Sequence, residues 1–246
     1  MARRGGAGEV EKPGKEFYII KGRQMPRVTT ILSVLSKPAL APWYAKQERE
    51  YFKTALERAL RLKGKVSYEK VEEIVKEAKQ AERTKQAAAE KGRDLHSAIH
   101  LFLTGRRPEL AEDTVPAFEL WRKWWTMLQR RHKVKVLDVE KTIYDEKNGY
   151  AGTMDIRFAL DGDPVIADWK SSNHIYGEYH LQNIAYRHAA SLLGMKSTAG
   201  FVVRIPRDGQ GEVETAKCPP EIVFEDFLAV FQAWRVWRKL QGRKTE

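Results

Sequence analysis

Two aspartates and a lysine stand at the ends of neighbouring apolar segments. Residues 149–170 read GYAGTMDIRFALDGDPVIADWK, with Asp155 between apolar residues and Asp168 and Lys170 after an apolar run. Side chains two apart in a strand point to the same face, so Asp168 and Lys170 share one. Buried carboxylates are costly unless they are paired, and converging carboxylates commonly bind a divalent cation. The segment therefore predicts a site for Mg²⁺ or Mn²⁺ with a lysine beside it.

These residue types suit the hydrolysis of a phosphodiester. A cation held by Asp155 and Asp168 would polarise a phosphoryl oxygen and lower the pKa of a bound water. Lys170 is placed to orient that water or to neutralise the charge that builds up on the phosphate. The structural alternative is a buried salt bridge, Asp168 with Lys170 or Asp155 with Arg157, but such pairs are poor stabilisers when buried.

The pattern around this segment predicts an α/β domain with a mixed central sheet. Before a turn at 161–164, Ile156, Phe158 and Leu160 alternate with polar or small residues, and after it residues 165–167 form an apolar run, which together predict two short strands. We expect further strands at residues 133–144, 195–206 and 212–217, and helices at about 177–193 and 222–241. Before residue 133 we expect one strand at residues 17–20, followed by a turn, and helical periodicity dominates from there on.

Glu140 could approach the acids, and a pair of histidines could bind a metal. Glu140 shares one face of the strand at 133–144 with the positions two and four before it, and an exposed acid paired with a lysine is its alternative role. His96 and His100 lie four residues apart in a predicted helix and therefore on one face. A histidine pair at this spacing can bind a metal, although packing is the commoner role.

The chain divides by composition into three parts. Residues 1–15, rich in glycine and charge, are expected to be a disordered basic tail. Residues 16–132 are expected to be mainly helical and to carry His96, and residues 133–246 to form the core as one compact unit. Trp43 and Tyr44 lie near the start of an amphipathic helix, where aromatics among basic residues could stack on bases. A core-facing stripe with a basic outer face is the commoner arrangement.

The charge balance favours a polyanionic partner. The 246 residues carry 44 Lys and Arg against 33 Asp and Glu, a formal net charge of +11. Nucleic acid is favoured over a membrane, since no run approaches the ~18 apolar residues of a membrane span. The single cysteine, Cys218, excludes an intrachain disulfide and argues against a cysteine-ligated zinc or iron–sulfur centre. The start of the chain has no apolar export signal, so a cytoplasmic protein is expected.

The order of these motifs resembles the PD-(D/E)XK nuclease superfamily and, within it, the RecB-like exonucleases of recombination enzymes, phages, mitochondria and CRISPR systems. Members carry a helical histidine followed by G-x-x-D, D-x-K and Q-x-x-x-Y, which are similar to His96 and residues 152–155, 168–170 and 182–186 here. The run DWKSS looks like the D-[YW]-K-[TS]-S run of the family, and the N-terminal PRVTTILS…LAPWYAK is similar to a pattern of phage-type members, so the resemblance covers roughly residues 17 to 206. Many CRISPR-associated relatives hold an iron–sulfur cluster with four cysteines, from which this chain departs.

The resemblance implies a restriction-endonuclease-like core with a helical N-terminal extension. It implies Mg²⁺ or Mn²⁺ held by His96, Asp155, Asp168 and the backbone carbonyl of Trp169, with no iron–sulfur cluster. Catalytic roles would fall to Lys170, the two aspartates and Glu140. Gln182 and Tyr186 would contact DNA or support the site, and the further DNA-contacting residues would be Ser171, Trp43 and Tyr44.

We therefore expect a metal-dependent DNA exonuclease, a hydrolase acting on single-stranded or end-exposed DNA in recombination or repair, and phage-encoded if it follows the phage-type members. Two alternatives share the fold: a structure-specific or restriction-type endonuclease, and a DNA-binding protein without turnover. The resemblance implies protein partners of the recombination or CRISPR type. The sequence leaves the oligomeric state open.

Overall fold

The computed structural model describes residues 10–11, 14, 16–35 and 80–243, together with 45–46, 49–50, 53–54, 57, 61 and 67–69. The chain separates into two compact units, Met1–Leu35 with Asp94–Glu246, and Ser36–Arg93. Helix α4 (Gln80–Leu103) begins in the second unit and ends in the first. Trp43 and Tyr44 lie outside the described residues. The boundary expected at residue 133 stays a prediction.

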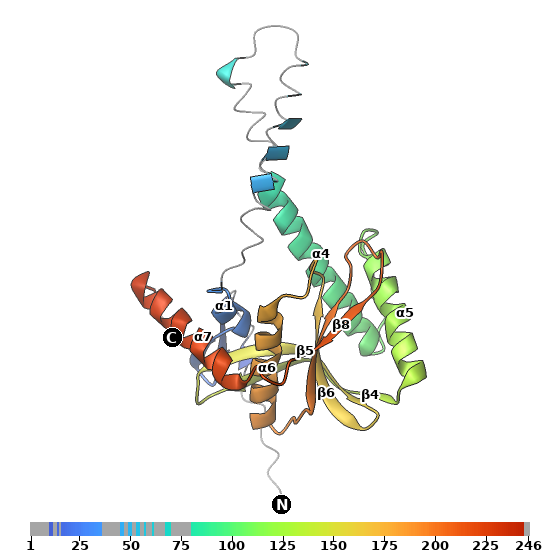
Figure 1. The fold of residues 1–246 in the computed structure, drawn as a ribbon, viewed down its shortest axis with the longest axis vertical. Helices are drawn as coiled ribbons and strands as arrows, with labels where there is room; N and C mark the ends of the chain where they lie inside the picture. Colours follow the sequence, from blue (N-terminus) through green and yellow to red (C-terminus); the bar gives the residue numbers. More distant parts are fainter. Residues whose placement is uncertain are drawn as a thin grey trace, which may run out of the picture. The chain divides into compact units, whose positions relative to one another are not determined.

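A five-stranded mixed sheet forms the centre of the larger unit (Figure 1). Its strands lie in the order β4 (Val134–Asp145), β5 (Tyr150–Leu160), β6 (Asp163–Lys170), β7 (Ala199–Arg204) and β8 (Glu214–Lys217). Strands β6 and β7 pair in parallel and are connected by helix α6 (Gly177–Leu192). The other neighbouring strands pair antiparallel. The fold class expected from the sequence, a mixed central sheet flanked by helices, is confirmed.

A tight turn at Asp161 and Gly162 joins β5 to β6. Both residues have positive φ, 53° and 102°, the combination for which Asp-Gly is the favoured hairpin sequence. The carboxylate of Asp161 also accepts hydrogen bonds from the backbone N–H of Lys133 (2.8 Å) and Nδ1 of His132 (2.6 Å). The turn therefore fixes the register of the hairpin and ties it to the start of β4.

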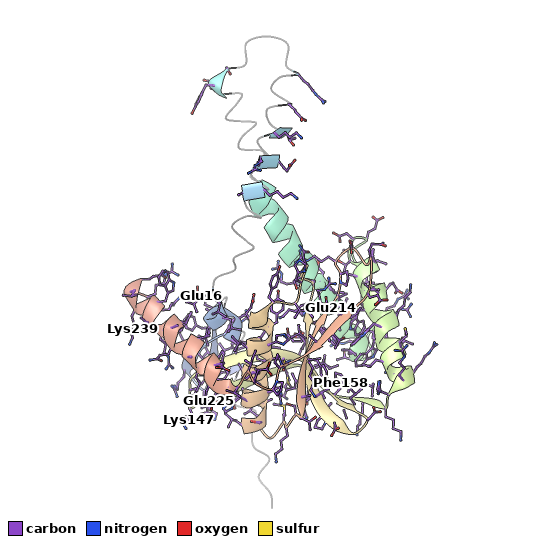
Figure 2. All side chains as sticks on the ribbon, viewed as in Figure 1. Glu16, Lys147, Phe158, Glu214, Glu225 and Lys239 are labelled. Carbon is purple, nitrogen blue, oxygen red and sulfur yellow. The ribbon has the colours of Figure 1, made fainter. Side chains whose placement is uncertain are left out.

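Helices cover both faces of the sheet (Figure 1). On one face, α6, α1 (Val28–Leu32) and α7 (Phe224–Leu240) bury a cluster that includes Ile166 of β6. On the other, the end of α4 and helix α5 (Val115–Arg131) pack against Phe158 and Trp169. Phe158, labelled in Figure 2, is buried, and its ring lies 5.6 Å from that of Trp125. Because side chains alternate along β6, Asp168 and Lys170 lie on the Ile166 side, which faces α6.

A small antiparallel sheet adjoins β5. Its strands are β1 (Val10–Glu11), β2 (Phe17–Ile20) and β3 (Arg23–Pro26), and Arg27 forms a parallel bridge with Ala151 of β5. Strand β2 was expected, whereas β3 was not, because its polar start and its proline do not alternate like a strand. Strand β1 lies within the stretch expected to be disordered. In the described part of the chain, no helix is long and apolar enough to cross a membrane.

Candidate metal centre

Strands β5 and β6 separate at Asp155 and Asp168. Their pairing ends at Ile156 with Ala167, so the two aspartates occupy the next positions, where the strands diverge. At this fork the backbone N–H of Trp169 donates a 2.7 Å hydrogen bond to Oδ2 of Asp155. The carboxylate thus takes the place of the strand carbonyl that the diverging ladder no longer supplies.

A buried amide connects Asp168 with Lys170. Nζ of Lys170 lies 2.5 Å from Oδ2 of Asp168 and donates a 2.9 Å hydrogen bond to Oε1 of Gln182. Nε2 of Gln182 donates to Oδ1 of Asp168 (2.8 Å) and approaches the hydroxyl of Tyr186 at 3.1 Å. Asp168 is only 1% exposed, so its charge is balanced inside the fold by the ammonium and the amide. Gln182 therefore holds the acid and the lysine in one arrangement.

His96, Glu140 and Asp155 bring three ligand atoms together, all within 4.8 Å of one another. Nδ1 of His96 lies 3.5 Å from Oδ1 of Asp155. Glu140 stands opposite Asp155, between the registered pairs of Val139 with Ile156 and Lys141 with Met154. Its φ is 49°, a left-handed conformation that is strained for a residue with a side chain. The fold therefore maintains a strained backbone where Glu140 meets the other two ligands.

The pKa values of two of the acids, Glu140 and Asp168, are raised. Burial of its carboxylate among neighbouring groups, reinforced by the Asp155 carboxylate, raises the pKa of Glu140 to about 7, although the residue as a whole is exposed. Burial likewise raises the pKa of Asp168 to about 6, against the opposing effect of Lys170. Both shifts reflect mainly the cost of burying a charged carboxylate, and the neighbouring Asp155 carboxylate adds a smaller contribution.

The pKa shifts of the remaining groups, Lys170, His96 and Asp155, favour their charged forms. Burial would lower the pKa of Lys170, but the carboxylates of Asp168 and Asp155 outweigh it and raise that pKa. The same balance, through Asp155, raises the pKa of His96. Burial opposes ionisation of Asp155, yet His96, Lys170 and the N–H of Trp169 lower its pKa overall. At neutral pH the site therefore contains an ammonium beside ionised carboxylate.

The donor set suits a hard divalent cation. Carboxylate oxygens are the ligands that Mg²⁺ prefers, and an imidazole nitrogen shifts the preference toward Mn²⁺. The spread of 4.8 Å between donors is close to twice a metal–ligand bond of about 2.1 Å, so small side-chain rotations would close them on one ion. The raised pKa of Glu140 agrees with a cation site, because a bound cation would supply the missing positive charge and favour the ionised carboxylate.

Most of the residues named from the sequence come together here: His96, Glu140, Asp155, Asp168, Lys170, Gln182 and Tyr186. Gln182 (6% exposed) and Tyr186 (4%) are buried, which favours support of the site over contact with DNA. The roles of Ser171 and of the Trp169 carbonyl stay predictions, as do those of Trp43 and Tyr44.

One pairing considered from the sequence is wrong. Arg157 binds Asp138 and not Asp155, with Nε and Nη2 each 2.7 Å from Oδ2 of Asp138. The register of the two strands explains this pairing, because Arg157 of β5 lies directly opposite Asp138 of β4. Asp155 therefore contacts His96 and the backbone N–H of Trp169 instead.

Two residues that the sequence analysis overlooked also shape the site. The ring centroid of Tyr179 lies 4.8 Å from Nζ of Lys170. Tyr179 is three residues before Gln182 on α6, and this helical spacing could have revealed it. Nδ2 of Asn183 donates to the carbonyls of Ile166 and Phe201, both at 3.2 Å, which clamps α6 to β6 and β7. No local pattern signals Asn183.

No protein-family profile matches the chain, and no curated protein sequence does. Among solved structures, the chain is similar to a putative exonuclease from Eubacterium rectale, at 12% identity and a TM-score of 0.43 over 63% of this chain and 69% of that one. It is also similar to LHK-Exo in complex with dAMP, at 14% identity and a TM-score of 0.34 over 61% of this chain and 80% of that one. A third solved structure is matched over 52% of this chain and 62% of its own length, less than two thirds, at 13% identity and a TM-score of 0.32. Similarity at this level leaves the function to be inferred from the site itself.

Proposed function

We propose that the protein is a metal-dependent DNA exonuclease of the RecB-like type, which hydrolyses phosphodiester bonds in DNA with free ends. One observation carries the proposal: the ligand atoms of His96, Glu140 and Asp155 converge within 4.8 Å beside the ion pair of Asp168 and Lys170. A cation site next to a fixed ammonium suits phosphodiester hydrolysis, because both charges stabilise the negative charge that grows on the phosphate as the bond breaks.

His96, Glu140 and Asp155, joined by Asp168, would hold Mg²⁺ or Mn²⁺. When bound, the ion would polarise a phosphoryl oxygen and acidify a water molecule. Glu140, whose pKa of about 7 leaves it partly protonated in the metal-free protein at neutral pH, would release that proton as the ion binds.

Lys170 acts as a fixed cation. Its raised pKa keeps the ammonium charged at neutral pH, so it does not serve as a base. The Asp168 carboxylate and the Gln182 amide oxygen set its position, and the face of the Tyr179 ring stabilises its charge. An ammonium held in this way stabilises the developing phosphate charge without a reorganisation cost during the reaction.

DNA is the proposed substrate because the overall charge of the chain favours a polyanion. The net charge of +11 favours a polyanion. A preference for free ends and a role in recombination or repair follow from the family resemblance of the motifs.

The test compares linear and closed circular DNA, single- and double-stranded, with Mn²⁺, Mg²⁺ or EDTA. We expect linear DNA to be degraded only with metal, circles to resist, and Lys170→Ala to be inactive. Lys147→Ala is the matched control, because Lys147 is exposed in the turn between β4 and β5. Equal cleavage of circles and linear DNA would contradict an exonuclease, and metal-dependent DNA binding without cleavage would contradict an enzyme.

A further inference from the structure

A row of aromatic side chains leads away from Lys170. Nζ of Lys170 lies 4.8 Å from the ring centroid of Tyr179, which is 5.6 Å from that of Tyr176. The ring of Tyr176 in turn lies 6.2 Å from that of His174. Successive rings are nearly perpendicular, at 79° and 88°. The row therefore runs without a break from the ammonium, through the first turn of α6, into the loop that precedes this helix.

These rings are outside the core. His174 is exposed, and Tyr176 and Tyr179 are half-buried. None of the three belongs to the buried apolar clusters found among the described residues. Gly177, between the two tyrosines, has no described atom within 4 Å of the place where a Cβ would lie. The row is thus open to solvent along part of its length.

The backbone beneath the rings is fixed by hydrogen bonds. Oγ of Ser172 donates to the carbonyl of His174 at 2.7 Å, and the backbone N–H of Tyr179 donates to the carbonyl of Tyr176 at 3.0 Å. A backbone held in this way loses little further conformational entropy when a ligand stacks on the rings that it carries.

Support of the lysine explains only the innermost ring. The contact of Tyr179 with the Lys170 ammonium is a cation–π interaction that stabilises the charge. Tyr176 and His174 extend the row outward, beyond the ring that touches the ammonium, and contribute nothing to the buried clusters. An aromatic surface of this kind beside a phosphate-binding cation has the chemistry of a surface for bases.

We propose that His174, Tyr176 and Tyr179 form a stacking track for the unpaired bases of a single DNA strand whose phosphate lies at Lys170. The inference rests on the proposed function and names its substrate as single-stranded or frayed. Every base offers a π-face, so stacking tolerates any sequence. In a duplex those faces are covered by neighbouring base pairs, so an intact duplex cannot use the track.

The test measures binding without turnover, in EDTA, by fluorescence anisotropy of labelled single-stranded and duplex oligonucleotides. Tyr176→Ala should weaken single-strand binding about tenfold, within the range known for loss of one stacked base, and leave duplex binding within twofold. Tyr176→Phe keeps the ring and should bind like the wild type. Trp237→Ala, which removes an exposed aromatic ring of α7, should also bind like the wild type.

A second arm moves a single abasic nucleotide along the strand. In the wild type, one or two positions should weaken binding about tenfold, and the same positions should have no further effect in Tyr176→Ala. Equal weakening of single-strand and duplex binding by Tyr176→Ala, or an abasic effect that persists unchanged in that variant, would overturn the track. Both arms exclude hydrolysis, so either result leaves the metal-dependent activity to be judged by its own assay.

Discussion

The ring of Tyr186 lies directly against Gly152: a Cβ atom at position 152 would fall 2.4 Å from Cε1 of that ring. The contact joins the strand of Asp155 to the helix of Gln182, and the Tyr186 hydroxyl lies 3.1 Å from Nε2 of Gln182. Gly152 thereby lets α6 approach close enough for the amide to bridge Asp168 and Lys170. The glycine of one motif and the tyrosine of the other are two halves of one packing contact.

Gly152→Ala should therefore damage the site through Tyr186. Overpacking at a buried contact costs about 1–3 kcal/mol, and displacement of Tyr186 should lower the hydrolysis rate at least tenfold by loosening Gln182. Thermal unfolding and initial rates would be measured together. Gly177→Ala, where an added methyl group meets open space, should not lower the Tm. A Gly152→Ala protein with unchanged Tm and rate would show that the close contact has no role.

Gln182→Leu should separate the acid from the lysine. A leucine fills similar space but leaves Oδ1 of Asp168 and Nζ of Lys170 without their amide partner, which costs about 1–3 kcal/mol. We expect the rate to fall ten- to a hundredfold while circular dichroism stays native. Gln241→Leu, at the exposed end of α7, is the control. Retention of the wild-type rate would mean that the bridge does not position Lys170.

Metal binding should depend on His96 and not on His100. Mn²⁺ should raise the Tm of the wild type by about 5 °C, because an ion that binds only the folded state stabilises it. His96→Ala should lose most of that increase, whereas His100→Ala, whose Nε2 lies 3.4 Å from Nη2 of Arg106, should retain it. Differential scanning fluorimetry with and without Mn²⁺ measures both. An equal increase in both variants would exclude His96 as a ligand.

Glu140 should make the metal-free protein less stable as the pH rises. Burial and the Asp155 carboxylate raise the pKa of Glu140 to about 7, so the folded state keeps a proton that the unfolded chain has lost. The stability that depends on this proton is present below the unfolded pKa and is lost as the pH rises through the folded one.

In EDTA, Glu140→Gln should therefore raise the Tm at about pH 8 and change it little at about pH 5. The expected gain is about 1 kcal/mol, or about 2–4 °C, because the exposed part of Glu140 is screened by water. Thermal melts across this range would give the result. A Tm difference that is the same at both pH values would contradict the raised pKa.

Local patterns predicted the elements that local chemistry determines. Asp161 and Gly162 marked the hairpin because few residue pairs accept two positive φ angles, and alternation placed Asp168 and Lys170 on one face. The helix carrying Gln182 followed from its apolar periodicity.

Contacts between distant segments were not readable in this way. The approach of His96 to Asp155 was expected only through the family resemblance, since nothing in their spacing brings them together. The partner of Arg157 was missed because it depends on the register of β4, which shifts between Val136 and Asp138. The row from Tyr179 outward was missed because the order of its rings depends on how the loop before α6 turns.

The hydrolysis rate of Asp155→Asn in Mn²⁺ tests the central claim most directly. Asp155 lies where strands β5 and β6 diverge, contacts His96, and would be a ligand of the ion. Its matched control is Asp138→Asn, which changes a part-buried carboxylate of β4 that pairs with Arg157. With end-labelled linear DNA, we predict that Asp155→Asn hydrolyses at least a hundredfold more slowly than the wild type. The wild type should lose its activity in EDTA and regain it when Mn²⁺ is added. Folded Asp138→Asn should hydrolyse at a near-normal rate. Hydrolysis by Asp155→Asn at the wild-type rate, or by wild type in EDTA, would contradict a metal-dependent nuclease centre at this fork.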